Sequence, residues 1–213
     1  MKIHLLRIIK KQKGFTLIEL LIVISIIGLI TAVVVFNQSD FSDQLALAST
    51  ADEIELQIRE AQVYSIGVRQ HADNTDFSVA YGVSFNLNTG GASNNSFLYF
   101  ADLDPKNNVY NTPTQCIADG STECIGRIPL ARGNIISNIC VIQDSGNEQC
   151  MPSVSRLDIT FARPNPNARI IFYNGTGGQA TFSNSNGARI EITSPKGQKK
   201  NIKVYTSGQI AIE

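Results

Sequence analysis

The stretch Lys13–Phe36, KGFTLIELLIVISIIGLITAVVVF, decides the fold of this chain. Its part Phe15–Phe36 has 22 residues and one charged side chain, Glu19. As an α-helix it would extend about 33 Å, enough to cross the hydrocarbon core of a membrane. An ordinary secretory signal has a shorter apolar region with a small-residue cleavage site behind it. A plain signal anchor fits the length but leaves Glu19 unexplained, because a carboxylate in a spanning helix costs about 2.5–3.5 kcal/mol on insertion scales.

The charges around this apolar run are distributed unevenly. The whole chain has 18 basic and 18 acidic residues, which argues against a general nucleic-acid binder. Residues 1–14 hold 5 of the basic residues and no acidic one. The positive-inside rule then places the N-terminus in the cytoplasm and residues 37–213 outside. We therefore expect a single-pass protein of the cytoplasmic membrane.

The segment Lys13-Gly14-Phe15-Thr16-Leu17-Ile18-Glu19-Leu20 resembles the N-terminal signature of type IV prepilins and type II secretion pseudopilins. The resemblance implies that a membrane peptidase cuts after Gly14 and methylates the new N-terminal residue, Phe15. It also implies that Glu19, the fifth residue of the mature chain, pairs with the Phe15 amine of a neighbouring subunit. Elementary chemistry agrees, because Gly14 lacks a Cβ at the point of cleavage and Glu19 would complement the dipole of the helix it begins.

The same resemblance implies a function and a set of partners. We expect a structural subunit of a type IV pilus or pilus-like filament, first held in membrane lipid and then located at the cell surface or in the periplasm. The partners would be the prepilin peptidase/methyltransferase, other pilin or pseudopilin subunits, and an inner-membrane assembly platform. One alternative is a minor pseudopilin of a type II secretion system. No cofactor is implied.

Helical periodicity continues beyond the apolar run. Apolar or small residues recur at intervals of four and three, as on one face of an amphipathic helix: Leu47, Ala51, Ile54, Ile58, Ala61 and Ser65. The helix should end near Gly67, a residue type that is favoured just after a helix. The polar segment Asn37–Asp43 makes a break or kink in the helix plausible.

The pattern changes to short strands from Phe77 onward, separated by turn signals such as Asn174-Gly175 and Asn186-Gly187. The candidate strands are Phe77–Leu87, Ser96–Phe100, Ile135–Ile142, Arg156–Phe161, Arg169–Tyr173, Gln179–Ser183, Ala188–Thr193, Lys200–Thr206 and Gln209–Ile212. One long helix followed by antiparallel strands is an α+β arrangement, and we expect a pilin-like fold. The chain then divides into a removed leader, a membrane or filament-core helix, an amphipathic continuation and a β-rich extracytoplasmic domain, at residues 1–14, 15–36, 37–67 and 68–213. Its final strand, Gly208–Ile212, resembles that of minor pilins and H-type pseudopilins.

The four cysteines all follow the predicted membrane helix. An even number of cysteines in an exported domain indicates disulfides, and four cysteines allow three pairings. We favour Cys116–Cys124 and Cys140–Cys150, because each pair brackets a polar, turn-like segment. The absence of a C-x-x-C spacing argues against a zinc site.

No catalytic constellation emerges, and we do not expect an enzyme. His71 is the one histidine outside the leader, and nothing marks partners for it. The oxygens of the segment Asp102–Asn108 could bind Ca²⁺, but Pro105 and Lys106 interrupt the pattern and a terminal acidic ligand is missing. A solvated turn is the favoured interpretation, so no metal site is predicted.

A basic cluster near the C-terminus comprises Lys196, Lys199 and Lys200. Some minor pilins that resemble this chain capture DNA through a basic C-terminal motif. A DNA-uptake role is therefore a further alternative, and its phosphate contacts would be independent of sequence and sensitive to salt. The simpler interpretation is a solvated hairpin or a surface that pairs with acidic groups of neighbouring subunits.

Overall fold

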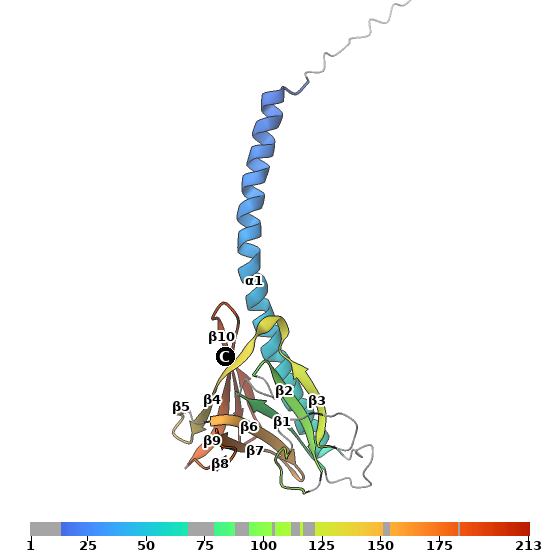
Figure 1. The fold of residues 1–213 in the computed structure, drawn as a ribbon, viewed down its shortest axis with the longest axis vertical. Helices are drawn as coiled ribbons and strands as arrows, with labels where there is room; N and C mark the ends of the chain where they lie inside the picture. The colour runs from blue at the N-terminus through green and yellow to red at the C-terminus, as the bar shows by residue number, and fades with distance from the viewer. Residues whose placement is uncertain are drawn as a thin grey trace, which may run out of the picture. The chain divides into compact units, whose positions relative to one another are not determined.

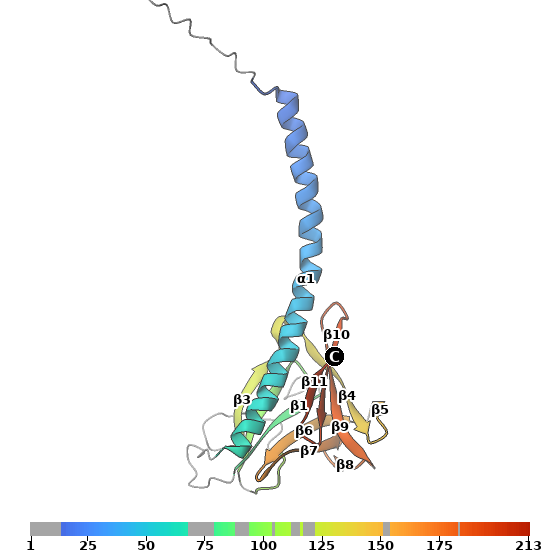
Figure 2. The same ribbon diagram turned by 180° about the vertical axis from the view of Figure 1, so that it is seen from behind.

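The computed structural model describes residues 14–67, 79–87, 94–103, 105–111, 116, 122–150, 154–182 and 184–213. The rest of the leader, residues 1–13, lies outside this part of the chain, as does His71. The chain forms two compact units, Met1–Ser42 and Asp43–Glu213. Figures 1 and 2 show the order of the elements from opposite sides.

One α-helix, α1 (Leu17–Ile66), carries the apolar run and its amphipathic continuation. Its backbone is helical throughout Asn37–Asp43, so the expected break is not found. That segment contains neither glycine nor proline, and its polar residues lower helix propensity only slightly. Gly67 follows the last helical residue and donates its backbone N–H to the carbonyl oxygen of Val63 at 2.9 Å, as the sequence predicted for the helix end.

Eleven strands and a short 3₁₀ turn, η1 (Ala131–Gly133), follow the helix in the described residues. The strands form two antiparallel sheets, and this confirms the α+β fold. The first sheet has the order β3-β2-β1-β6-β7-β8, and the second has the order β11-β10-β9-β4-β5. The bounds in chain order are β1 Ala80–Asn86, β2 Ser96–Asp102, β3 Cys124–Pro129, β4 Ile135–Gln143, β5 Glu148–Cys150, β6 Val154–Ala162, β7 Asn165–Asn174, β8 Gln179–Ala180, β9 Ser185–Thr193, β10 Lys199–Tyr205 and β11 Ile210–Ile212.

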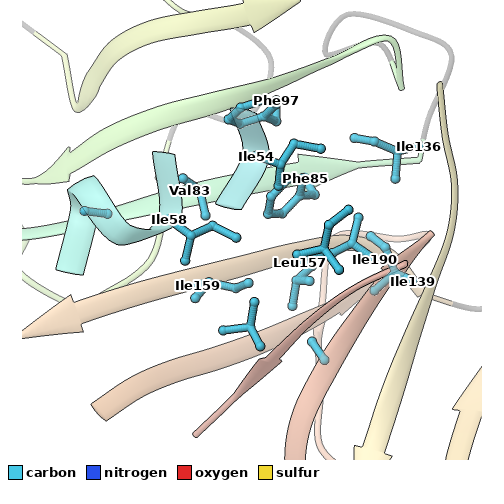
Figure 3. Packing of buried hydrophobic residues seen from close by; sticks show 14 of the residues in the cluster. Ile54, Ile58, Val83, Phe85, Phe97, Ile136, Ile139, Leu157, Ile159 and Ile190 are labelled. Atoms are coloured by element: carbon cyan, nitrogen blue, oxygen red, sulfur yellow. The ribbon is translucent and has the colours of Figure 1, made fainter. Parts of the chain in front are cut away.

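The C-terminal half of α1 shares one hydrophobic core with both sheets (Figure 3). Ile54 and Ile58 have no exposed surface and lie among side chains from β1, β6 and β9. All six residues of the predicted helical stripe are at most 3% exposed, so the stripe is confirmed as the buried face. Burying such branched apolar side chains is the dominant favourable term in folding.

A second, smaller apolar cluster covers the other face of the first sheet. It joins Leu98 and Phe100 of β2 to Tyr110 and to Cys124, with Cys116 packed against it. Every residue of β2 is buried, because alternate side chains point into the two clusters. The segment around Tyr110 therefore forms a layer over the sheet on the side away from α1.

Two disulfides tie the strand edges. Cys116 is bonded to Cys124 at the start of β3, and Cys140 of β4 is bonded to Cys150 of β5. Cys140 and Cys150 are direct partners in the strand register. These are the two pairings that we predicted from the polar, turn-like segment between the cysteines of each pair.

Candidate functional site

The predicted cleavage point is exposed and precedes the helix. Gly14 and Phe15 lie outside regular secondary structure, and the Phe15 side chain is 82% exposed. A Cβ added to Gly14 would meet no atom within 4 Å. Phe15 is separated from Leu17, the first residue of α1, by Thr16 alone. The Gly14–Phe15 peptide bond is therefore accessible at the very start of the helix.

Thr16 caps the N-terminus of α1. Its Oγ1 accepts a hydrogen bond from the backbone N–H of Glu19 at 3.3 Å, and its carbonyl oxygen accepts one from Leu20 at 3.2 Å. Thr16-Leu17-Ile18-Glu19 has the spacing of a capping box, Thr-x-x-Glu, in which the cap satisfies an amide that has no partner inside the helix. This function of Thr16 was not predicted from the sequence, although the spacing alone signals it.

The carboxylate of Glu19 lies in the first turn of α1 and is exposed. Within the described residues, its side chain makes no hydrogen bond or ion pair. The hydroxyl groups farther along the apolar segment, in contrast, form hydrogen bonds within the helix. Ser25 donates to the Leu21 carbonyl oxygen at 2.8 Å, and Thr31 donates to the Ile27 carbonyl oxygen at 2.7 Å. Glu19 is thus the charged group of this segment for which the described residues supply no partner.

The segment Leu17–Val35 is long and apolar enough to cross a membrane. Its large side chains are all exposed in the isolated chain, and this surface has to be covered by lipid or by other helices. The site therefore combines an accessible peptide bond, a capped helix start, a carboxylate without a partner among the described residues, and an apolar helix surface.

The C-terminal basic cluster is partly neutralised. Lys196 Nζ lies 2.9 Å from Asp43 Oδ2, and Lys199 Nζ lies 2.9 Å from Glu191 Oε1. The hydrogen bond from Lys196 holds the pKa of the Asp43 carboxyl below its usual value. Lys200 lines a groove beside these two pairs. The three lysines are thus brought together, but two of them already have acidic partners.

The Asp102–Asn108 segment uses its first carboxylate to order its own backbone. Asp102 accepts hydrogen bonds from the N–H groups of Asn107 and Asn108, at 3.1 Å and 3.0 Å. Burial raises the pKa of the Asp102 carboxyl. Asp104 lies outside the described residues, which contain no group of three or more His, Cys, Asp or Glu side chains placed to hold a metal ion.

Two further buried carboxylates hold the same layer in place. Glu123 accepts from the backbone N–H of Asn111 at 2.6 Å and from its side-chain amide at 2.8 Å. Asp158 accepts from the Tyr110 N–H at 3.1 Å and forms an ion pair with Arg156 at 2.7 Å. These groups are structural, and nothing in the sequence pattern singled them out.

Comparison with known families gives one match. The model of the prokaryotic N-terminal methylation motif matches residues 9–35. The matched range contains the whole proposed processing site, including Gly14, Phe15 and Glu19. No curated protein and no solved structure matches the chain. The match confirms the resemblance that residues 13–20 indicated.

Proposed function

We propose that this chain, which is a protein of the type IV prepilin and pseudopilin type, is a structural subunit of a type IV pilus or pilus-like filament. The observation that carries the proposal is Glu19: a carboxylate in the first turn of a capped apolar helix, inside the matched methylation motif, for which the described part of the chain supplies no partner. An isolated charge in an apolar environment is costly, and a neighbouring subunit offers an amine of opposite sign.

The proposed sequence of events starts in the membrane. The peptidase hydrolyses the Gly14–Phe15 bond at the cytoplasmic face and methylates the Phe15 amine, which keeps its positive charge. The amine of an entering subunit then pairs with the Glu19 carboxylate of a subunit already in the filament. Neutralising both charges favours one axial register over others, and the apolar surface of Leu17–Val35 moves from lipid to helix–helix contact.

The role in this proposal is structural, not catalytic. Its support is that the buried carboxylates Asp102, Glu123 and Asp158 all accept hydrogen bonds from backbone N–H groups of the globular unit. The same processing serves the pseudopilins of type II secretion. Recovery of the chain from sheared surface material would indicate a pilus, and retention in the cell envelope would indicate a secretion pseudopilus.

The test is mass spectrometry of the N-terminal peptide from the native host, combined with Glu19→Ala. We expect a wild-type chain that begins at N-methylated Phe15. Glu19→Ala should be processed in the same way, yet fall at least about tenfold in the filament fraction. Asp144→Ala, at an exposed turn of the globular unit, is the matched control and should assemble normally. Retention of residues 1–14 beside an active peptidase, or normal filaments from Glu19→Ala, would refute the proposal.

A further inference from the structure

A groove of about 270 Å³ lies where α1 meets the β9–β10 hairpin, within the unit Asp43–Glu213. Its lining combines one apolar side chain with amides and ammonium groups: Gln44, Leu47, Gln198, Lys199 and Lys200. The side-chain oxygen of Gln198 is buried and has no hydrogen-bond partner among the described residues. A buried acceptor needs a hydrogen-bond donor, so a carboxylate that enters the groove would contact the ammonium groups of Lys199 and Lys200 and not this oxygen.

The surroundings of this basic groove are cationic. Arg132 and Lys196 lie beside it with Lys199 and Lys200, and the two nearby acidic partners are Asp43 and Glu191. The side chains of Arg132 and Lys199 keep 57% and 58% of their surface exposed despite their ion pairs. A carboxylate that approaches the groove therefore meets an excess of positive charge.

The matching surface lies on α1 itself. Asp52, Glu53 and Leu56 share one exposed side of the helix, because Leu56 follows Glu53 by three residues and Asp52 by four. Leu56 is 63% exposed. On the same helix Glu55 is occupied by Arg59, whose Nε donates to it at 2.8 Å. We call Asp52, Glu53 and Leu56 the acidic helix face.

The groove and the acidic helix face form no ion pair with each other within the described residues of one chain. The groove is built on Gln44 and Leu47, and Asp52 lies about 12 Å from Gln44 and about 7.5 Å from Leu47 along the same helix, at 1.5 Å per residue. An ion pair between these two surfaces therefore requires two copies. Because the two surfaces are different, the contact is heterologous, and repeating it produces an open chain of subunits instead of a closed dimer.

We propose that the acidic helix face of one copy docks into the basic groove of the next. Asp52 and Glu53 would face Lys199 and Lys200, and Leu56 would cover the apolar wall at Leu47. This inference rests on the proposed filament function and assigns it a second contact, separate from the Glu19 site. Opposite charges at this contact would set the register between globular units, while like charges would reject a wrong one.

The first experiment is disulfide trapping in filaments from the native host, with the full chain carrying Asp52→Cys and Lys199→Cys together. We expect a ladder of multimers under non-reducing conditions, and no ladder from either single variant. The matched control pairs Asp52→Cys with Thr176→Cys, at an exposed hairpin tip outside the proposed interface, and should give no ladder.

The second experiment exchanges charges. Lys200→Glu and Glu53→Lys should each lower filament yield about tenfold, and their combination should restore it to within about twofold. Ser145→Glu with Thr176→Glu, at two other hairpin tips, should leave the yield unchanged. Processing at Phe15 is measured in every variant, so a defect at the groove is distinguished from a defect in maturation.

The wild-type chain could form filaments while the double-cysteine variant gives no ladder and the charge exchange gives no rescue. That result would overturn the interface and leave the proposed function standing. A processed chain that never enters a filament would overturn both. Binding of duplex DNA that Lys200→Glu abolishes, with filament yield unchanged, would identify the groove as a nucleic-acid site instead.

Discussion

Arg163, between β6 and β7, donates from Nε to the carbonyl oxygen of Ser65 at 3.2 Å, and from its guanidinium also to the carbonyl of Gly67. The last carbonyl groups of a helix have no partner inside the helix, and the last turn of α1 contains no basic residue of its own. A residue from the turn between β6 and β7 therefore supplies the C-terminal cap and ties the end of α1 to the β domain.

Replacing this cap should weaken the fold. We expect Arg163→Ala to lower the free energy of unfolding by about 1–2 kcal/mol, because charged donors are lost at carbonyl oxygens near the helix end. Urea unfolding of the full chain in detergent measures the change. Arg169→Ala, on an exposed strand position, should stay within about 0.5 kcal/mol. Equal effects of the two substitutions would argue against a capping role.

Replacing a large side chain by alanine should affect the free energy of unfolding very differently on the two sides of α1. Ile58→Ala leaves a cavity at a side chain with no exposed surface and should cost about 2–5 kcal/mol in unfolding free energy. Leu56→Ala, two residues away on the 63% exposed side, should cost less than about 0.5 kcal/mol. The same urea titration compares them. A large loss from Leu56→Ala would mean that this side is covered in the solubilised protein.

The strongest periodic signals in the sequence predicted the fold well. The stripe from Leu47 to Ser65 is buried as expected, and the alternating segments around Ile139 and Ile190 are paired strands. Two strands were missed. β5 is fully exposed and polar, and β3 contains Gly126 and a terminal proline. Neither has the composition of an independent strand, and both are attached at sheet edges next to a disulfide.

The predicted processing site rests on a local sequence pattern, whereas other contacts join distant residues and leave no such pattern. Gly14, Phe15 and Glu19 are recognised from eight consecutive residues, and the cap at Thr16 was present in the same stretch. The contact between Arg163 and Ser65 joins positions 98 residues apart, so no spacing rule could reveal it. The role of Asp102 depends likewise on how the following backbone turns, with Asn108 at φ 61°.

The two disulfides should stabilise different parts of the β domain. They close loops with separations of 8 and 10 residues, so removing either by a Cys→Ala pair should lower the unfolding free energy by about 2–3 kcal/mol on the chain-entropy account. Limited proteolysis followed by mass spectrometry distinguishes them. Loss of Cys140–Cys150 should expose cleavage between β4 and β5, and loss of Cys116–Cys124 should expose the layer around Tyr110.

Each disulfide variant is the control for the other. Cys140 has no exposed surface, and Arg189 Nη2 lies 2.9 Å from its sulfur. Replacing Cys140 and Cys150 by alanine therefore leaves the charged side chain of Arg189 beside an altered strand edge. Cleavage in the same place for both variants would show that the two edges unfold together and would contradict the separate roles.

The stability of the β domain should rise in mildly acidic solution because of Asp102 and Glu123. Burial raises the pKa of both carboxyls, and in Glu123 the nearby charge of Asp102 adds to the rise. A raised folded-state pKa means that the folded chain binds protons more readily than the unfolded chain. The free energy of unfolding therefore increases as the pH falls through the raised pKa values toward the ordinary carboxyl range near about 4, by at most about 1.4 kcal/mol per pH unit for each group.

Other carboxyls act in the opposite direction at lower pH. Hydrogen bonds from Lys196 and Lys203 lower the pKa values of Asp43 and Glu148, so their stabilisation is lost as the pH falls below about 4. The unfolding free energy should thus pass through a maximum between the two ranges. Glu123→Gln should flatten the rise that accompanies the fall in pH toward about 4 and leave the loss of stability at lower pH unchanged. Urea titrations at a series of pH values test this, with Glu60→Gln on α1 as the control. An unaltered rise in Glu123→Gln would show that the buried carboxyl of Glu123 is not its source.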